Sequence, residues 1–268
     1  MASPELEAAL NAARAAGEVI QRLYRSNLAV QIKADRSPVT EADLQAERVI
    51  RAVLSEQFPG YGFYGEETGQ HAMDAENIWL VDPIDGTKDY IRNEDGYSVM
   101  IGLVCDGRPT VGVVHQPTLD RTYFATPDGG AHVEHAGVCT PLAVSNVATS
   151  AAVRLVASKS HRSADLDRVK IALGIDNELN IGSVGLKLSV IATGTHDLYV
   201  NPSAKTKAWD TCAPEAILVR AGGRLSDMFG GPIEYRGELQ HRRGLIASNA
   251  AVHDEVVQKL GPLFPQLA

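Results

Sequence analysis

The sequence is poor in cysteine and has no excess of positive charge. The chain has three cysteines, Cys105, Cys139 and Cys212. A small, odd number of cysteines argues against a disulfide framework. The net charge of −8 argues against a nucleic-acid polymer as partner, because a phosphate backbone is bound by a basic surface. No hydrophobic run reaches the length of a membrane span, and residues 1–5 lack secretory-signal features. These absences predict a cytoplasmic protein with no membrane partner.

The composition is otherwise that of a globular protein, with 44% hydrophobic and 22% charged residues. A chain of 268 residues is long enough for one large domain or two moderate ones. Helices and hairpin strands are expected in the first half, whereas strands and helices alternate in the second. We therefore predict an α+β domain over residues 1–147 and an α/β domain over residues 148–268.

Hydrophobic periodicity and turn residues give the expected elements. Asp106-Gly107 predicts a hairpin turn. Pro83 is expected to end the strand that begins at Ile78. Helices are predicted over 4–24, 40–57, 165–173, 182–191, 212–221 and 252–260. Strands are predicted over 61–64, 78–81, 97–104, 110–115, 121–125, 154–157, 198–200 and 245–248.

In the stretch 78–90, a segment expected to be a buried strand is followed directly by two carboxylates. Asp82 and Asp85 are held three positions apart by Pro83, and Gly86 permits a close approach of backbone to a ligand. The amides of Gly86 and Thr87 then open a helix, whose N-terminus favours an anion. Hard oxygen ligands beside an anion-binding turn suit Mg²⁺-assisted phosphate chemistry. An ordinary acidic turn is the alternative.

Two further acids precede this stretch, and each has a simple structural explanation. Thr40 is typical of a helix N-cap, and Asp43 in the first turn complements the helix dipole. Glu66 and Glu67 follow Gly65, where a solvated turn is common. Their interest lies in their position, a short loop upstream of Asp82.

Three segments in order, residues 65–67, 82–87 and 209–211, are more specific than any one of them. They resemble the lithium-sensitive, magnesium-dependent phosphomonoesterase superfamily that includes the inositol monophosphatases, and the resemblance covers nearly the whole chain. It implies a layered αβαβα sandwich of the sugar-phosphatase type, combining α+β and α/β parts. It also implies two or three Mg²⁺ ions. The implied metal ligands are Glu66, Asp82, the Ile84 carbonyl, Asp85 and Asp210.

The same resemblance assigns the catalytic pair. Asp43 and Thr87 match the residues that orient or deprotonate the attacking water. Lys33 lies near the position of a family lysine at the metal site, with a one-residue difference in spacing. The amides of Gly86 and Thr87 are expected to stabilise the transferred phosphoryl group.

Several segments resemble the 3'(2'),5'-bisphosphate nucleotidase branch of the superfamily, namely 88–90, 158–161, 182–187 and 207–215. The resemblance implies hydrolysis of the 3'-phosphate of 3'-phosphoadenosine 5'-phosphate, a small-molecule phosphate ester. The candidates for holding the nucleotide are Ser158, His161, Ser183 and Lys187. Taken singly, a lone histidine or lysine is more often a surface residue.

Two other functions remain open on the sequence. An inositol monophosphatase or a broad sugar phosphatase would use the same metal ligands with a different leaving group. A non-catalytic metal- or nucleotide-binding module would keep the scaffold, although such a module has no need of a water-activating threonine. The resemblance also admits a homodimer, which nothing in the sequence shows.

Overall fold

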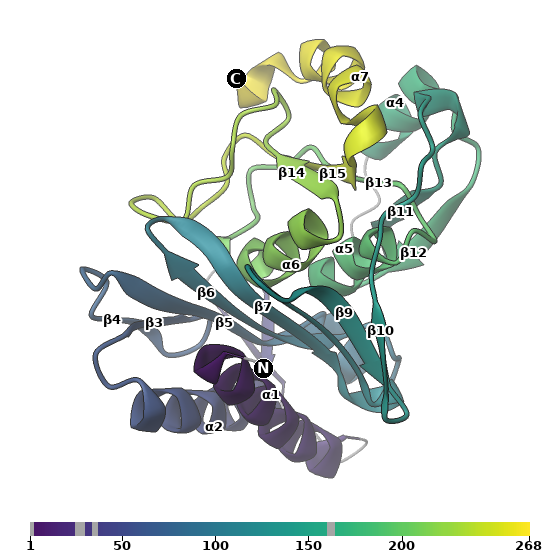
Figure 1. Ribbon diagram of the computed structural model, residues 1–268. Helices are drawn as coiled ribbons and strands as arrows, with labels where there is room; N and C mark the ends of the chain where they lie inside the picture. The colour runs from purple at the N-terminus through teal and green to yellow at the C-terminus, as the bar shows by residue number, and fades with distance from the viewer. Residues whose placement is uncertain (1–2, 25–29, 34–36, 160–163) are drawn as a thin grey trace.

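The computed structural model describes residues 3–24, 30–33, 37–159 and 164–268, which form two main β-sheets separated and flanked by helices (Figure 1). The helices are α1 (Pro4–Leu23), α2 (Glu41–Gln57), α3 (Thr87–Ile91), α4 (Ala164–Leu173), α5 (Val184–Ala192), α6 (Ala208–Arg220) and α7 (Ala250–Leu260). The strands are β1 (Val30–Ile32), β2 (Pro38–Thr40), β3 (Gly62–Gly65), β4 (Gly69–His71), β5 (Asn77–Asp85), β6 (Ser98–Cys105), β7 (Arg108–Gln116), β8 (Arg121–Thr126), β9 (Gly130–His135), β10 (Val138–Pro141), β11 (Leu155–Ser158), β12 (Glu178–Ile181), β13 (Leu198–Asn201), β14 (Gly223–Ser226) and β15 (Leu245–Asn249).

The larger sheet has eight strands in the order β10-β9-β8-β7-β6-β5-β3-β4. Its pairs are antiparallel except β3 with β5, which run parallel. The smaller sheet has five strands in the order β12-β11-β13-β15-β14, and β11 is parallel to both of its neighbours. Strands β1 and β2 form a separate antiparallel pair just before α2. The hairpin-rich half and the α/β half predicted from the sequence each build one sheet.

The layers follow the order helix, sheet, helix, sheet, helix. Helices α1 and α2 cover one face of the larger sheet, and α5 and α6 lie between the two sheets (Figure 1). Helices α4 and α7 pack on the outer face of the smaller sheet. The predicted αβαβα sandwich is therefore confirmed.

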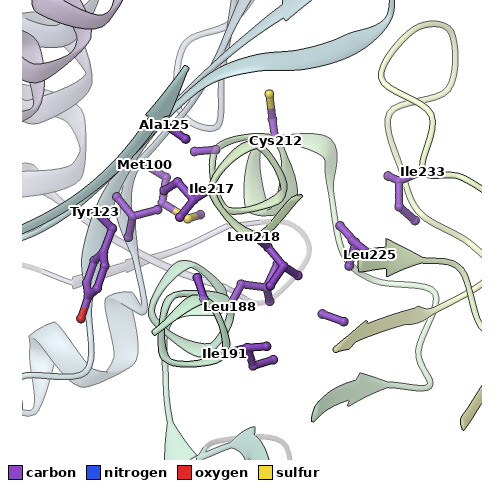
Figure 2. Packing of buried hydrophobic residues seen from close by; sticks show 14 of the residues in the cluster. Met100, Tyr123, Ala125, Leu188, Ile191, Cys212, Ile217, Leu218, Leu225 and Ile233 are labelled. Atoms are coloured by element: carbon purple, nitrogen blue, oxygen red, sulfur yellow. The ribbon is translucent and has the colours of Figure 1, made fainter. Parts of the chain in front are cut away.

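The middle helix layer joins the sheets through a shared hydrophobic core. Met100 and Tyr123 of the larger sheet and Leu225 of the smaller sheet belong to one buried cluster with residues of α5 and α6 (Figure 2). Leu188 and Ile217 represent these two helices. Because this cluster spans both sheets, the division at residue 147 into two domains stays a prediction.

Helix α6 lies unusually close to the larger sheet because two strands offer glycine where they meet it. A Cβ on Gly112 of β7 would overlap the Ala213 carbonyl, and one on Gly102 of β6 would press on Cys212 and Ala213. Absence of a side chain at both positions lets the helix backbone approach the strands. This contact fixes where the N-terminus of α6 points, and Asp210 lies there.

Three expectations from the sequence are wrong in detail. Strand β5 does not end at Pro83 but continues to Asp85, with an irregular register between Asp82 and Asp85 that accommodates a residue lacking an N–H. Helix α6 begins at Ala208, four residues before the predicted start. Strands β2, β4, β9, β10, β12 and β14 were not predicted.

The described residues include no helix long and apolar enough to cross a membrane. Cys105, Cys139 and Cys212 are free thiols. A cytoplasmic location stays a prediction.

Candidate active site

The first turn of α2 carries the carboxylate of Asp43 into the protein interior. Thr40 caps the helix, and its backbone amide and hydroxyl donate to Asp43 Oδ2 at 2.7 and 2.6 Å. Asp43 is 1% exposed, and this burial raises its pKa to about 6 despite the two hydrogen bonds from Thr40. Asp43 thus complements the helix N-terminus, as expected, and also has a second oxygen free for another partner.

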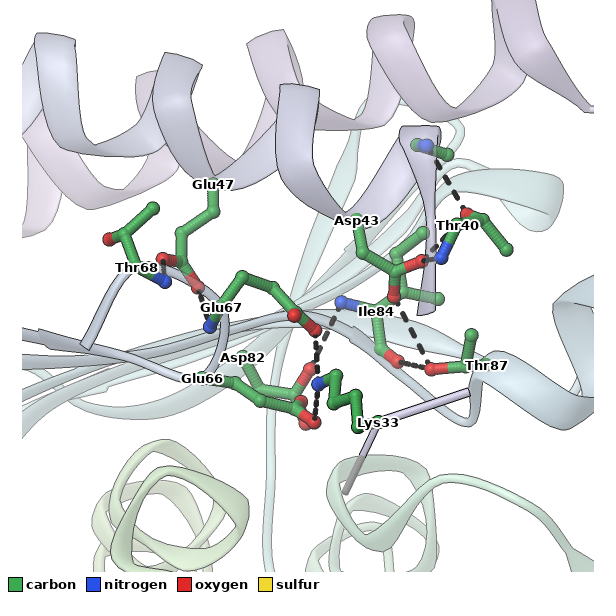
Figure 3. A network of polar contacts seen from close by, with 11 residues as sticks. Lys33, Thr40, Asp43, Glu47, Glu66, Glu67, Thr68, Asp82, Ile84 and Thr87 are labelled. Carbon is green, nitrogen blue, oxygen red and sulfur yellow. Dashed lines mark hydrogen bonds and ion pairs between the residues drawn. The ribbon is translucent and has the colours of Figure 1, made fainter. Parts of the chain in front are cut away.

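That second oxygen faces Thr87. The Thr87 hydroxyl lies 3.3 Å from Asp43 Oδ1 and 3.0 Å from the Ile84 carbonyl oxygen, so both are within reach of its proton (Figure 3). The two residues are 44 positions apart in the sequence. The structure brings together the pair that the sequence predicts as catalytic.

The two aspartates at the end of β5 are both buried. Asp82 Oδ1 accepts from the Ile84 amide at 3.0 Å. Asp85 Oδ2 accepts from the Ser183 hydroxyl at 2.5 Å and from the Gly185 amide at 2.8 Å, at the start of α5. The irregular register of β5 therefore places both carboxylates at one corner, and α5 fixes the orientation of the second.

Asp210 reaches the same corner from α6. Its Oδ2 accepts from the Lys207 amide at 2.7 Å, which holds the side chain against the first turn of the helix. Burial and the charge of Asp85 raise the pKa of Asp210 well above its usual range. Asp210 is thus exposed to the charge of Asp85 from the first turn of α6, and its role as a metal ligand stays a prediction.

Glu66 completes the group from the turn after β3. Lys33 Nζ bridges Glu66 Oε1 at 2.7 Å and Glu67 Oε1 at 2.6 Å (Figure 3). Burial raises the pKa of Glu67 to about 7, although Lys33 opposes this. Lys33 thus balances part of the negative charge of Glu66 and Glu67. It lies at the site despite its one-residue difference in spacing from the family lysine.

Glu47 is a site residue that the sequence analysis missed. It lies one turn after Asp43 on α2, is fully buried, and accepts from the amides of Glu67 at 2.8 Å and Thr68 at 2.6 Å. A Cβ on Gly65 would overlap its carboxylate, so the glycine makes room for it. The available signal was its spacing, because a charged residue stood four positions after Asp43 on a helix face that is otherwise apolar.

The carboxylates at this corner suit divalent cations. Burial, followed by the charges of Glu66, Asp85 and Asp210, raises the pKa of Asp82 well above its usual range. One oxygen each of Asp82, Asp85 and Asp210 has no hydrogen bond to any described residue. Carboxylate oxygens are hard donors, which Mg²⁺ prefers as ligands. The uncompensated negative charge at this corner also favours a divalent cation.

The side chains do not yet form a closed cage. Within the described ranges no group of three acidic, histidine or cysteine side chains is already arranged to enclose an ion. Lys33 holds Glu66 by an ion pair, and Glu66 would have to share or exchange this partner to ligate a metal. The residue types fit Mg²⁺, and occupancy of the site requires adjustment at Glu66.

Two of the predicted substrate-binding residues are buried and already hydrogen-bonded. Ser183 caps α5 and holds Asp85, and its hydroxyl also pairs with Ser98 at 2.9 Å. Lys187 Nζ donates to the carbonyls of Gly182 at 2.7 Å and Ile181 at 3.3 Å. In this arrangement Ser183 orients Asp85 and Lys187 binds the 181–182 backbone. Direct contact of these two residues with a nucleotide stays a prediction.

The remaining predicted substrate-binding positions are Ser158, His161 and Gly86. Ser158 is half-buried at the end of β11, and His161 lies outside the described residues. Gly86 has a φ of 100°, a conformation that favours glycine, and precedes α3, which has only five residues. Binding of a phosphoryl group by the Gly86 and Thr87 amides stays a prediction.

The family is decided by comparison with known sequences. The model of the "Inositol monophosphatase family" matches residues 1–262. The chain belongs to the inositol monophosphatase family. It is accordingly a phosphoric monoester hydrolase, and the corner formed by β5, α2 and α6 is the candidate active site of this phosphatase.

Relatives of the phosphatase carry different activities. It is 35% identical over 235 residues to the 3'(2'),5'-bisphosphate nucleotidase CysQ of Escherichia coli K12, covering 83% of this chain and 90% of the relative. It is 33% identical over 267 residues to a histidinol-phosphatase of Mycobacterium tuberculosis, covering 97% and 99%. The structure of an inositol monophosphatase from Anabaena superposes with a TM-score of 0.78 at 26% identity, covering 96% of this chain and 95% of the other. The family is shown, and the substrate remains open among these classes.

Proposed function

We propose that this phosphatase is a Mg²⁺-dependent 3'(2'),5'-bisphosphate nucleotidase that removes the 3'-phosphate of 3'-phosphoadenosine 5'-phosphate. The observation that carries the hydrolytic part is the Thr87 hydroxyl held at Asp43, immediately beside the carboxylate corner. A binding module would have no use for a hydroxyl aimed in this way. The products would be adenosine 5'-phosphate and inorganic phosphate.

The residues of the chain would activate water as follows. Because Thr87 directs its proton towards Asp43 Oδ1 and the Ile84 carbonyl, its Oγ lone pairs are free to accept a hydrogen bond from a water molecule. Asp43 then receives the proton through Thr87 Oγ as the water oxygen bonds to phosphorus. The bond from phosphorus to the 3'-oxygen breaks in line with this attack, and the 3'-oxygen leaves with the bonding electron pair and takes a proton from solvent water.

Magnesium would supply the remaining chemistry. Mg²⁺ held by Glu66, Asp82, the Ile84 carbonyl, Asp85 and Asp210 lowers the pKa of water and neutralises charge on the leaving oxygen. The amides of Gly86 and Thr87 would receive the equatorial phosphoryl oxygens. Ser183 and Lys187 act as positioning residues, since Ser183 orients Asp85 and Lys187 holds the 181–182 carbonyls.

The choice of a nucleotide rests on the resemblance of segments 88–90, 158–161 and 207–215 to the nucleotidase branch, and on the CysQ relatives. A second candidate substrate is histidinol phosphate, which the nearly full-length match to a histidinol-phosphatase favours. An inositol or broad sugar phosphatase is the third. A homodimer and a cytoplasmic location complete the proposal.

A phosphate-release panel tests the proposal. The purified protein is assayed with Mg²⁺ on adenosine 3',5'-bisphosphate, histidinol phosphate, inositol 1-phosphate and fructose 1,6-bisphosphate. We expect the highest kcat/KM for the adenosine bisphosphate, and loss of release in excess EDTA. The Asp85→Asn variant should lose activity by orders of magnitude while keeping its fold. A higher kcat/KM for another ester would replace the substrate assignment, and no release from any would favour the binding module.

A further inference from the structure

A second feature lies beside the carboxylate corner and is not used by the chemistry above. A pocket of about 280 Å³ is lined by α3 and the segment after it, by strands β7, β8 and β12, and by α5. Its polar lining includes Asp89, Gln116, Lys159 and Asn180, and none of the proposed metal ligands takes part. It is therefore a separate recess next to the site.

Two side chains in this pocket present buried acceptors that lack a donor. Both carboxylate oxygens of Asp89 and the amide oxygen of Asn180 are inaccessible to solvent and have no hydrogen-bond partner among the described residues. Asp89 is 1% exposed. A buried acceptor without a donor destabilises the fold, and a carboxylate does so more than a neutral group. An arrangement of this kind calls for a ligand that supplies N–H groups.

Comparison with other buried acids shows how unusual Asp89 is. Asp197 is fully buried and accepts from the amide and guanidinium of Arg154, and Asp227 accepts from the amides of Phe229 and Gly231. Asp89 instead packs against the backbone of Gly96 and Gly182, and a Cβ on either glycine would overlap its Oδ2. The chain makes room for this carboxylate without giving it a partner.

The position of Asp89 relates the pocket to the proposed reaction. Gly182 precedes Ser183, which holds Asp85, and the Ser183 amide donates to the Gly96 carbonyl at 2.9 Å. Ile181, which lines the pocket, is therefore two residues away from Ser183, which orients the proposed metal ligand Asp85. The organic part of a phosphate ester bound at the carboxylate corner would extend into such a neighbouring recess.

Charge and shape indicate the chemistry of the occupant. Three acids line the pocket, Asp89, Glu94 and Asp95, against two bases, Lys159 and Arg121. Lys159 is paired with Glu94 at 2.6 Å, and its charge also favours the ionised form of Asp89. This ion pair is partly exposed, at 40% and 36%, and marks the side open to solvent. Apolar side chains, namely Leu119, Ile181, Leu186 and Val190, supply the rest of the lining. A flat or short apolar body carrying an amino group matches this combination.

We propose that this recess is the leaving-group pocket of the phosphatase, in which Asp89 and Asn180 accept hydrogen bonds from an amino or ammonium group of the substrate. The inference rests on the proposed function, since it assumes hydrolysis at the carboxylate corner. It narrows the substrates to phosphate esters whose organic part carries nitrogen. The exocyclic amine of adenine and the ammonium of histidinol phosphate both offer the required donor, whereas inositol offers hydroxyl groups alone.

Two substitutions at Asp89 distinguish an ammonium donor from a neutral adenine amine. Asp89→Asn removes the charge but keeps one acceptor oxygen, and Asp89→Ala removes both. For an ammonium substrate we expect both variants to raise KM by about tenfold or more, because a charge-assisted hydrogen bond is lost. For a neutral adenine amine we expect the large rise in Asp89→Ala and a smaller one in Asp89→Asn. Asp254→Asn is the control, because Asp254 is an exposed acid paired with Arg224 and does not line the pocket.

The readout is KM and kcat for adenosine 3',5'-bisphosphate, histidinol phosphate and inositol 1-phosphate in each variant. Support requires a raised KM for at least one nitrogen-bearing substrate, with kcat for that substrate and both constants for inositol 1-phosphate unchanged. Equal changes for all three substrates, or no change for either nitrogen-bearing one, overturn the inference. Thermal melting should show variants at least as stable as the parent, because a buried unpaired charge has been removed. If the parent protein releases no phosphate, the proposed function fails first and independently.

Discussion

Thr87 has one hydroxyl proton and two acceptors within 3.3 Å, which fixes what the hydroxyl can do. The hydroxyl donates its single proton to Asp43 Oδ1 or to the Ile84 carbonyl, and its lone pairs can then accept a hydrogen bond from water. The other oxygen of Asp43 is fully engaged by Thr40. Because Thr40 binds only Oδ2 of Asp43, Oδ1 is available to receive a proton from Thr87.

Substitution of Thr87 tests this assignment. Thr87→Ala should lower kcat by about 10²- to 10⁴-fold, the usual contribution of a positioned acid–base group, while Thr87→Ser should restore most of the activity because the hydroxyl is kept. The measurement is steady-state phosphate release at saturating Mg²⁺. An alanine variant as active as the serine variant would remove Thr87 from the mechanism.

The same pair sets the pH dependence. Burial raises the pKa of Asp43 to about 6, and only its ionised form accepts a proton. Activity should therefore fall as the pH decreases through about 6, and bound cations should move this limb to lower pH because they favour the carboxylate. A kcat profile that is level from pH 7 down to pH 4 would contradict the assignment.

At the scale of elements, α2 delivers two carboxylates from a single face. Asp43 and Glu47 are four residues apart, so they lie one above the other on the side that faces the sheet. Asp43 points to Thr87, whereas Glu47 reaches the Gly65-Glu66-Glu67 turn through the Glu67 and Thr68 amides (Figure 3). The helix therefore fixes the distance between the catalytic pair and the turn that carries Glu66.

Glu47 should consequently act as a positioning residue for metal binding. In Glu47→Ala the two amides lose their acceptor and the turn is no longer held, so we expect the Mg²⁺ concentration for half-maximal activity to rise by about tenfold. The effect on kcat at saturating Mg²⁺ should be smaller. Gln45→Ala is the matched control, because Gln45 lies on the same helix but bonds only Glu41 at the surface. An equal loss of kcat and Mg²⁺ affinity would indicate general damage.

Some elements could be predicted from the sequence and others could not, for physical reasons. Helices α1 and α2 have one apolar face and clear caps, so their periodicity shows. Strand β10 is exposed at all four positions and forms a sheet edge, so no hydrophobic alternation marks it. Pro83 was expected to end β5, but a register irregularity tolerates it, and only pairing with β6 reveals that.

The site shows the same division between local and long-range information. Asp82, Asp85 and Thr87 lie within a short motif, so the sequence places them together. The use of Ser183 to hold Asp85 depends on α5 docking from 98 residues away, and no local pattern encodes it. Lys187, the candidate for holding the nucleotide, is buried, and the carbonyls of Ile181 and Gly182 accept hydrogen bonds from its ammonium group.

At the scale of the whole molecule, the carboxylate corner lies where the larger sheet meets the middle helix layer. Asp82 and Asp85 belong to the larger sheet, Glu66 follows β3 of the same sheet, and Asp210 belongs to the middle helix layer. Repulsion among these charges opposes the packing of α6 on the sheet, which Gly102 and Gly112 make so close. A divalent cation at the corner would reverse the sign of that interaction and bind the folded state alone.

Mg²⁺ should therefore stabilise the fold as well as support catalysis. At about 100 times its dissociation constant, a ligand specific for the folded state adds roughly 2.7 kcal/mol, which corresponds to a rise in Tm on the order of 5 °C for a chain of this size. Differential scanning calorimetry with and without MgCl₂ measures this, with NaCl at equal ionic strength as the control for screening. In Asp210→Asn the rise should shrink while Tm without Mg²⁺ increases, because repulsion between the layers is relieved. A Mg²⁺ effect unchanged by this substitution would mean that α6 contributes no ligand and that the ion, if bound, belongs to the larger sheet alone.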